Sequence, residues 1–474
     1  MKLYGAEMKN TWVGKEQFVN LQEKIRQNSI VGFLLVSAGI LLATSAGGWD
    51  ITNHLLNKPE SFFSPPHAAL YLGVGLVIIG AILIYIGRSI IRGRKSRNTT
   101  HHTQRLKAVI QVVSASYSSG PPLSVKLVYL GVILLVSAGP FDFVWHSTFG
   151  LDGLLSPPHA VLTIGMTLCS IGSFLGILST SKDMVYGTKS NGRDINAKKN
   201  NGYVTNNLTL SENSRIREIF TTRLHNKSLR PAFVIMGILP VWLTISGLIH
   251  MATLPFSDTP FFNFNPDPIV AIVIATICFP FLIAIILFSS SRLCGNESAN
   301  LITGHKSVTS WKNNNKGIPF GVLSVTGLAF IVVNILTSIL PNEYLIPTLP
   351  FYILNILPIL AADILLSKGS LHNRNHNFSK QRENWMANYL AGAILGLAFF
   401  TLYFPLITHT YNEALPNPGP VWPSLTITIY FKMIDEVSVF IIAPAMIMGI
   451  FGVVVASRLL DRKERRKITT SELA

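Results

Sequence analysis

The chain has 474 residues, of which 49% are hydrophobic and only 13% are charged. Soluble globular domains carry about 25% charged residues, so this composition excludes an ordinary water-soluble protein. The formal net charge is +16, but the basic residues gather in loops between alternate apolar segments. We therefore expect a lipid bilayer as the main partner and no nucleic acid.

Long apolar segments run through the whole sequence. Because crossing a ~30 Å hydrocarbon core takes about 20 residues, they predict an all-α, polytopic transmembrane bundle of about ten helices in five hairpins. The third segment is short but continues through Pro140–His146. In chain order the segments are Ile30–Gly48, Pro66–Ile91, Val125–Gly139, Pro157–Ser179, Pro231–Ile249, Pro268–Ser291, Ile318–Leu340, Tyr344–Leu366, Tyr389–Ile407 and Val437–Leu460.

The loops alternate in charge, which predicts how the chain is oriented. Every second loop is rich in lysine and arginine, whereas the others carry only Lys58 and Lys432. By the positive-inside rule the basic loops are cytoplasmic, so we expect a multi-pass protein of the cell membrane with both termini cytoplasmic. The basic clusters are Arg92–Lys107, Lys182–Arg230, Arg292–Lys316, Lys368–Arg382 and Arg458–Lys467.

The same pattern suggests a domain organisation. Residues 1–29 are polar and form a cytoplasmic N-terminal segment, in which we expect no cleavable signal peptide. Residues 30–180 form two duplicated hairpins, which together contain four helices. Residues 181–230, rich in Asn, Lys, Ser and Thr, form a cytoplasmic linker. Residues 231–460 form a six-helix membrane region, and residues 461–474 a basic cytoplasmic tail.

An internal repeat lies within the first two hairpins. Ser45–Gly73 matches Ser137–Gly165 without gaps at an offset of 92 residues, the difference between 142 and 50. The identities fall on Asp, His, Pro and Gly, within sequence that is otherwise interchangeable aliphatic residues. Such identity indicates duplication of a functional unit.

Each copy contains the pattern D-x3-H-x12-H. An Asp and a His four residues apart share one face of a helix. The second His follows Ser-Pro-Pro, a helix-start signal, so it lies in the first turn of the next helix. A tight antiparallel hairpin then brings the three side chains together at the outer end. The two predicted ligand sets are Asp50, His54 and His67, and Asp142, His146 and His159.

Two imidazoles and one carboxylate suit Cu(II), Fe(II) or Zn(II), and composition alone does not choose among these metals. The set leaves positions open for water or substrate. A single Asp–His pair could instead be a salt bridge that holds a helix end, but two copies at identical spacing favour metal. Five further residues are weaker candidates that could hydrogen-bond to the ligands. These are Glu60, Asp152, His250, His409 and Glu413.

The third hairpin resembles a decayed copy. His250 lies at the end of its first helix, with Ser246 at the position of the Asp.

Farther along, Asp363 lies deep within an apolar segment, and we expect Asn334 and Asn355 as its partners. It is either a structural hydrogen-bonded acid or part of a proton or ion path.

At the repeated motif the sequence resembles the C subunit of the particulate methane and ammonia monooxygenases. That family has a copper site with the pattern D-x3-H-x12-H, and Trp145, directly before His146, also matches the family pattern. The resemblance implies that both ligand sets bind copper. It covers only the two hairpins, and the family subunit has fewer helices than we expect here.

These observations lead to two functional hypotheses and a third, simpler one. The first is a membrane copper protein with monooxygenase-like oxidoreductase chemistry on a small apolar substrate, working with other membrane subunits or as a homo-oligomer. The alternative is a non-enzymatic protein for acquisition, sensing or transport of copper or zinc. The third is a structural subunit in which the metal sites only hold the hairpins together. Whether the chain is an enzyme stays open.

Overall fold

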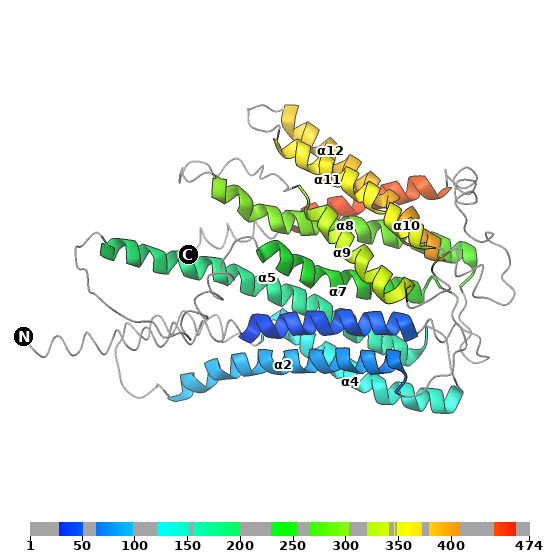
Figure 1. The fold of residues 1–474 in the computed structure, drawn as a ribbon, viewed down its shortest axis with the longest axis horizontal. Coiled ribbons are helices and arrows are strands. Elements are labelled where there is room, and N and C mark those ends of the chain that lie inside the picture. The colour runs from blue at the N-terminus through cyan, green and yellow to red at the C-terminus, as the bar shows by residue number, and fades with distance from the viewer. Residues whose placement is uncertain are drawn as a thin grey trace, which may run out of the picture. The chain divides into compact units, whose positions relative to one another are not determined.

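A computed structural model describes most of the apolar chain (Figure 1). Within the part it describes, the regular elements are all helices, which confirms the predicted all-α bundle. The residues described are 28–50, 63–97, 121–150, 155–199, 229–254, 266–302, 320–340, 346, 348–371, 379–407 and 440–460.

The first described helix in the chain is Asn28–Asp50, and the last is Phe440–Leu460. The elements between them are α2 (Pro65–Arg97), α4 (Leu123–Phe149), α5 (Pro157–Lys199), α7 (Leu229–Met251), α8 (Pro268–Ile302), α9 (Val322–Asn334), the π-helix η2 (Ile335–Ile339), α10 (Leu349–Leu354), α11 (Ile356–Leu371), α12 (Ser379–Leu397) and α13 (Phe399–Leu402).

Nine helices in the described ranges are long and apolar enough to cross a membrane. The remaining predicted segment, Ile318–Leu340, forms α9 and continues as the π-helix η2. Its apolar helical stretch, Val322–Thr337, is shorter than a full span. The segment predicted as Tyr344–Leu366 is also irregular, because it breaks at Asn355 between α10 and α11.

The chain divides into two compact units. Residues 1–40, 74–133 and 168–237 form one, and residues 41–73, 134–167 and 238–474 form the other. The predicted metal ligands that the structure describes all belong to the second unit; they are Asp50, His67, Asp142, His146 and His159. The sequence-based boundary at the 181–230 linker stays a prediction, because residues 200–228 lie outside the described ranges. Residues 181–199 continue α5 as helix.

The duplicated hairpins repeat their helix packing. A Cβ atom added to Gly80 would lie 2.8 Å from Val36 Cγ2 and 2.9 Å from its backbone nitrogen. A Cβ atom added to Gly172 would lie 2.9 Å from the same two atoms of Val128. Both pairs are related by the offset of 92 residues. The two helices of each hairpin are therefore held at close range by an equivalent glycine contact.

Asp363 has a structural role at the start of α9. Its buried carboxylate accepts hydrogen bonds through Oδ2 from the backbone amides of Gly321 and Ser324, both at 3.0 Å, and from the Ser324 hydroxyl at 2.7 Å. Asp363 thus supplies from α11 the cap that α9 lacks locally. Asn334 and Asn355 bond to a carbonyl and a threonine hydroxyl instead, so their expected partnership with Asp363 was wrong.

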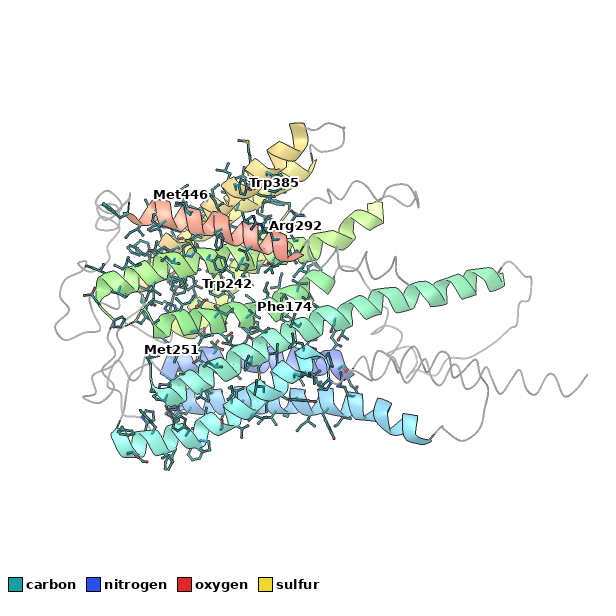
Figure 2. The ribbon with its side chains drawn as sticks, turned by 180° about the vertical axis from the view of Figure 1, so that it is seen from behind. Phe174, Trp242, Met251, Arg292, Trp385 and Met446 are labelled. Carbon is teal, nitrogen blue, oxygen red and sulfur yellow. The ribbon has the colours of Figure 1, made fainter. Side chains whose placement is uncertain are left out.

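The C-terminal region packs around aromatic side chains. Helices α11 and α12 lie side by side (Figure 1). Trp242, labelled in Figure 2, is fully buried, stacks on Phe330 at 3.8 Å, and donates its indole N–H to the Tyr403 hydroxyl at 2.9 Å. The Tyr403 ring stacks on Phe279 at 3.8 Å. Helix packing here relies on aromatic contacts, and the hydrogen bond to Tyr403 satisfies the buried indole N–H of Trp242.

Candidate metal centre

The second hairpin brings its three predicted ligands together. Asp142 and His146 lie one turn apart near the end of α4, and His159 lies in the first turn of α5. Asp142 Oδ1 is 3.4 Å from His146 Nε2 and 3.5 Å from His159 Nε2. All three ligand atoms lie within 4.8 Å of one another. The predicted Asp/His/His group therefore exists as a spatial cluster.

Local sequence explains how α5 presents its histidine. Ser156 directly precedes the helix, Pro157 is its first residue, and the Ser156 hydroxyl accepts from the His159 amide at 3.4 Å. The Ser156 carbonyl accepts the first helical bond, from Ala160, at 2.9 Å. Proline at this position lacks only an amide hydrogen that has no helical partner. His159 is thereby fixed at the helix start, facing α4.

The end of α4 orients the other histidine. His146 Nδ1 lies 3.0 Å from the carbonyl oxygen of Gly150. A carbonyl can only accept, so Nδ1 carries the hydrogen and Nε2 presents its lone pair. Gly150 adopts φ +82°, a left-handed conformation that favours glycine, and its amide donates to the His146 carbonyl at 3.0 Å. Metal-bound histidines are commonly oriented by such a bond.

The spacing of the ligand atoms fits a metal ion. Bonds of about 2.0–2.2 Å in a tetrahedral site put neighbouring ligand atoms about 3.3–3.6 Å apart, which matches both Asp142–imidazole distances. Those distances exceed the usual 2.7–3.2 Å of an N–H···O hydrogen bond. Among the described residues, none donates a hydrogen bond to the buried Oδ1 atom of Asp142. A cation would satisfy this oxygen.

The first hairpin repeats the contact between helices. His67 Nε2 lies 3.0 Å from Asp50 Oδ1, which parallels the His159–Asp142 pair. Asp50 is only 7% exposed. His54, the third predicted ligand of this set, lies outside the described residues. The structure thus brings together two of three ligands in this copy and all three in the other.

The weaker candidates are only partly covered. Four of them lie outside the described residues, namely Glu60, Asp152, His409 and Glu413. His250 lies at the end of α7, with its ring 4.9 Å from Phe279 and 5.6 Å from Tyr403. Its Nδ1 atom is buried and has no hydrogen-bond partner in the described part of the chain. A role beside the metal ligands stays a prediction for all five.

Sequence reasoning missed two contributors to the site. Gly150 could have been found, because a glycine just after a helix is a common termination signal. Tyr71, one turn after His67, stacks on that ring with centroids 6.2 Å apart. The repeat gave no signal for it, because Thr163 occupies the equivalent position in the second copy.

Fold and site together define a multi-pass helical membrane protein with a carboxylate and two imidazoles placed closely enough to bind a metal ion. No protein-family model, curated protein or solved structure matches the chain.

Proposed function

We propose that this protein binds copper through its two Asp/His/His sets and uses it to oxidise a small apolar substrate that arrives through the bilayer. The observation that carries the proposal is the convergence of Asp142, His146 and His159 within 4.8 Å. The first set, Asp50, His54 and His67, would hold a second ion. Both termini would be cytoplasmic, which places the sites at the outer face of the cell membrane.

The ligand chemistry supports copper. Imidazole nitrogen with carboxylate oxygen suits Cu(II), and the motif resembles a known copper site at the same spacing. Iron and zinc also accept these ligands. Copper, when bound, would supply one-electron redox chemistry and open positions for exogenous molecules. The protein's own contribution is to fix His146 through Gly150 and to set His159 opposite Asp142.

The surroundings of the site support an apolar substrate. Phe143 and Val144, next to Asp142 in sequence, are 62% and 59% exposed. In a membrane these side chains face lipid, where small apolar molecules concentrate. Such molecules would reach the ligand set without crossing water. Partner membrane subunits or further copies of this chain would complete an oxidase, as they do in the monooxygenases that the motif resembles.

The alternative is metal acquisition, sensing or transport without catalysis. Transport would be favoured by ionisable residues lining a path across the bilayer. Asp363 was the strongest residue for such a path, but its Oδ2 atom caps α9. This engagement favours a structural role for Asp363 and oxidation over transport.

Metal analysis and electron paramagnetic resonance of the full chain test the proposal. We expect one copper ion for each Asp/His/His set, with nitrogen hyperfine structure from the imidazoles. The His54→Ala/His146→Ala double variant should lose this copper, whereas His376→Ala, in a basic loop, should retain it. Oxidation of short alkanes or alkenes, with dioxygen and a reductant supplied, should follow the copper content. Zinc in place of copper would contradict oxidoreductase chemistry, because zinc has no redox states.

A further inference from the structure

Arg292 lies near the end of the apolar span Ile269–Cys294 of α8 and has an unsatisfied buried donor. Its Nε atom is buried and has no hydrogen-bond partner in the described part of the chain. The guanidinium carbon lies 5.3 Å from the ring centroid of Phe288, which is fully buried. Side chains on an α-helix point toward its N-terminus, so Arg292 folds back over the preceding turn. Because arginine keeps its charge in proteins, this buried N–H group calls for an anionic acceptor.

Aromatic side chains on α12 mark the membrane boundary at this end of the second compact unit. Trp385 is 57% exposed, and its ring lies edge-on to that of Tyr389 with centroids 6.0 Å apart. Exposed tryptophan and tyrosine on a transmembrane helix favour the interface between lipid and water. Figure 2 shows Trp385 and Arg292 toward the same end of this unit, with Met251 toward the other. Arg292 therefore lies near the level of the lipid headgroups.

The last helix, Phe440–Leu460, brings a second arginine to this level. A Cβ atom added to Gly452 would lie 2.9 Å from the Cβ atom of Ala284, so this helix packs directly on α8. The two helices run in the same direction (Figure 1). Arg458 follows Gly452 by six residues, which is about 9 Å along a helix. Arg292 follows Ala284 by eight residues, or about 12 Å. Two half-buried arginines thus lie at similar depth on adjacent helices.

We propose that Arg292 and Arg458 bind the phosphate of an anionic phospholipid. Guanidinium groups bind phosphate oxygens through two N–H groups at once, and a phospholipid presents its phosphate at this depth. A zwitterionic lipid carries an ammonium group beside its phosphate, which two arginines repel. The sequence after the last helix adds further positive charge, with Arg462 and Lys463 close to its end. The inference does not depend on metal binding at the Asp/His/His sets.

Native mass spectrometry of the full chain, purified in a neutral detergent, tests the preference for an anionic lipid. The probes are phosphatidylglycerol and phosphatidylcholine with the same acyl chains. We expect phosphatidylglycerol to bind about 10-fold more tightly, because charge-assisted hydrogen bonds form without a repelled ammonium group. Arg292→Gln should lose most of this preference, and the Arg292→Gln/Arg458→Gln double variant should lose all of it. Equal affinity of the unmodified protein for the two lipids would overturn the inference.

Two further variants separate this site from a general effect of charge. Arg88→Gln removes the same charge from the end of a span in the other compact unit and should retain the preference. Arg292→Lys keeps the charge but not the planar guanidinium, so its preference should fall as well. An unchanged preference in both Arg292 variants would overturn the inference. Inorganic phosphate that displaces phosphatidylglycerol at equal concentration would also overturn it, because the occupant would then be a free ion.

Discussion

The second and third hairpins each place a polar residue and a histidine four residues apart near the end of their first helix, but the two pairs have different surroundings. In the second, Asp142 and His146 face His159. In the third, Ser246 and His250 occupy the same relative positions, yet Ser246 lies 2.6 Å from the Tyr403 hydroxyl and His250 packs against aromatic rings. A spacing of four residues puts both groups on one face in each case. The residue type then decides whether the face attracts a cation or completes an apolar core.

Removing the carboxylate should break this comparison most strongly. Asp142→Ala deletes the only charged ligand of the second set. Loss of a group that merely orients a ligand weakens metal binding about 10–100-fold, so loss of the ligand should exceed about 100-fold. The matched change in the third hairpin, Ser246→Ala, should leave copper affinity unchanged. Titration of the detergent-purified protein with copper measures both. Equal affinities in the Asp142 variant and the unmodified protein would refute the ligand assignment.

Tyr403→Phe tests the third hairpin, where Ser246 and His250 pack against aromatic side chains. It would leave the buried Trp242 N–H and the Ser246 hydroxyl without the oxygen they now share. Unsatisfied buried polar groups of this kind cost about 1–3 kcal/mol each in the free energy of unfolding. Unfolding in a detergent titration should show this loss, with metal content unaffected. A variant as stable as the parent would show that the hydrogen bonds contribute little.

Gly150→Ala should produce a smaller effect, on metal affinity. At φ +82° an alanine would be strained by about 1–2 kcal/mol. The carbonyl that orients His146 would shift as the turn relaxes, and copper affinity at the second set should fall about 10-fold. Gly139→Ala is a suitable control, because a Cβ atom there meets nothing within 4 Å. An unchanged affinity would mean that the Gly150 carbonyl does not orient the ligand.

The membrane spans were predictable from sequence because the bilayer imposes a minimum apolar length. Pro157–Ser179, for example, matches the observed span Pro157–Thr180 within one residue. The irregularities differ in this respect. No proline or glycine lies within the π-helix Ile335–Ile339, so the sequence carried no sign of it. The break at Asn355 could have been predicted, because the ring of Pro358 clashes with the carbonyl of Leu354, four residues earlier.

The metal site was also partly predictable, because local helix geometry limits where its side chains can lie. Helical periodicity placed Asp142 and His146 on one face, and Ser-Pro-Pro placed His159 at a helix start; both expectations are confirmed. The stacking of Tyr71 on His67 was not predictable, because the second copy has Thr163 at the equivalent position. Sequence repeats reveal what is duplicated, whereas contacts that only one copy makes require the packed structure.

The most direct test of the central claim is the copper content of the full chain with Asp142, His146 and His159 all replaced by alanine. Inductively coupled plasma mass spectrometry, on protein purified from its own membrane, should find that the triple variant has lost the copper of the second set. The first set should keep its copper. Undiminished copper in the triple variant, or none in the unmodified protein, would contradict the account.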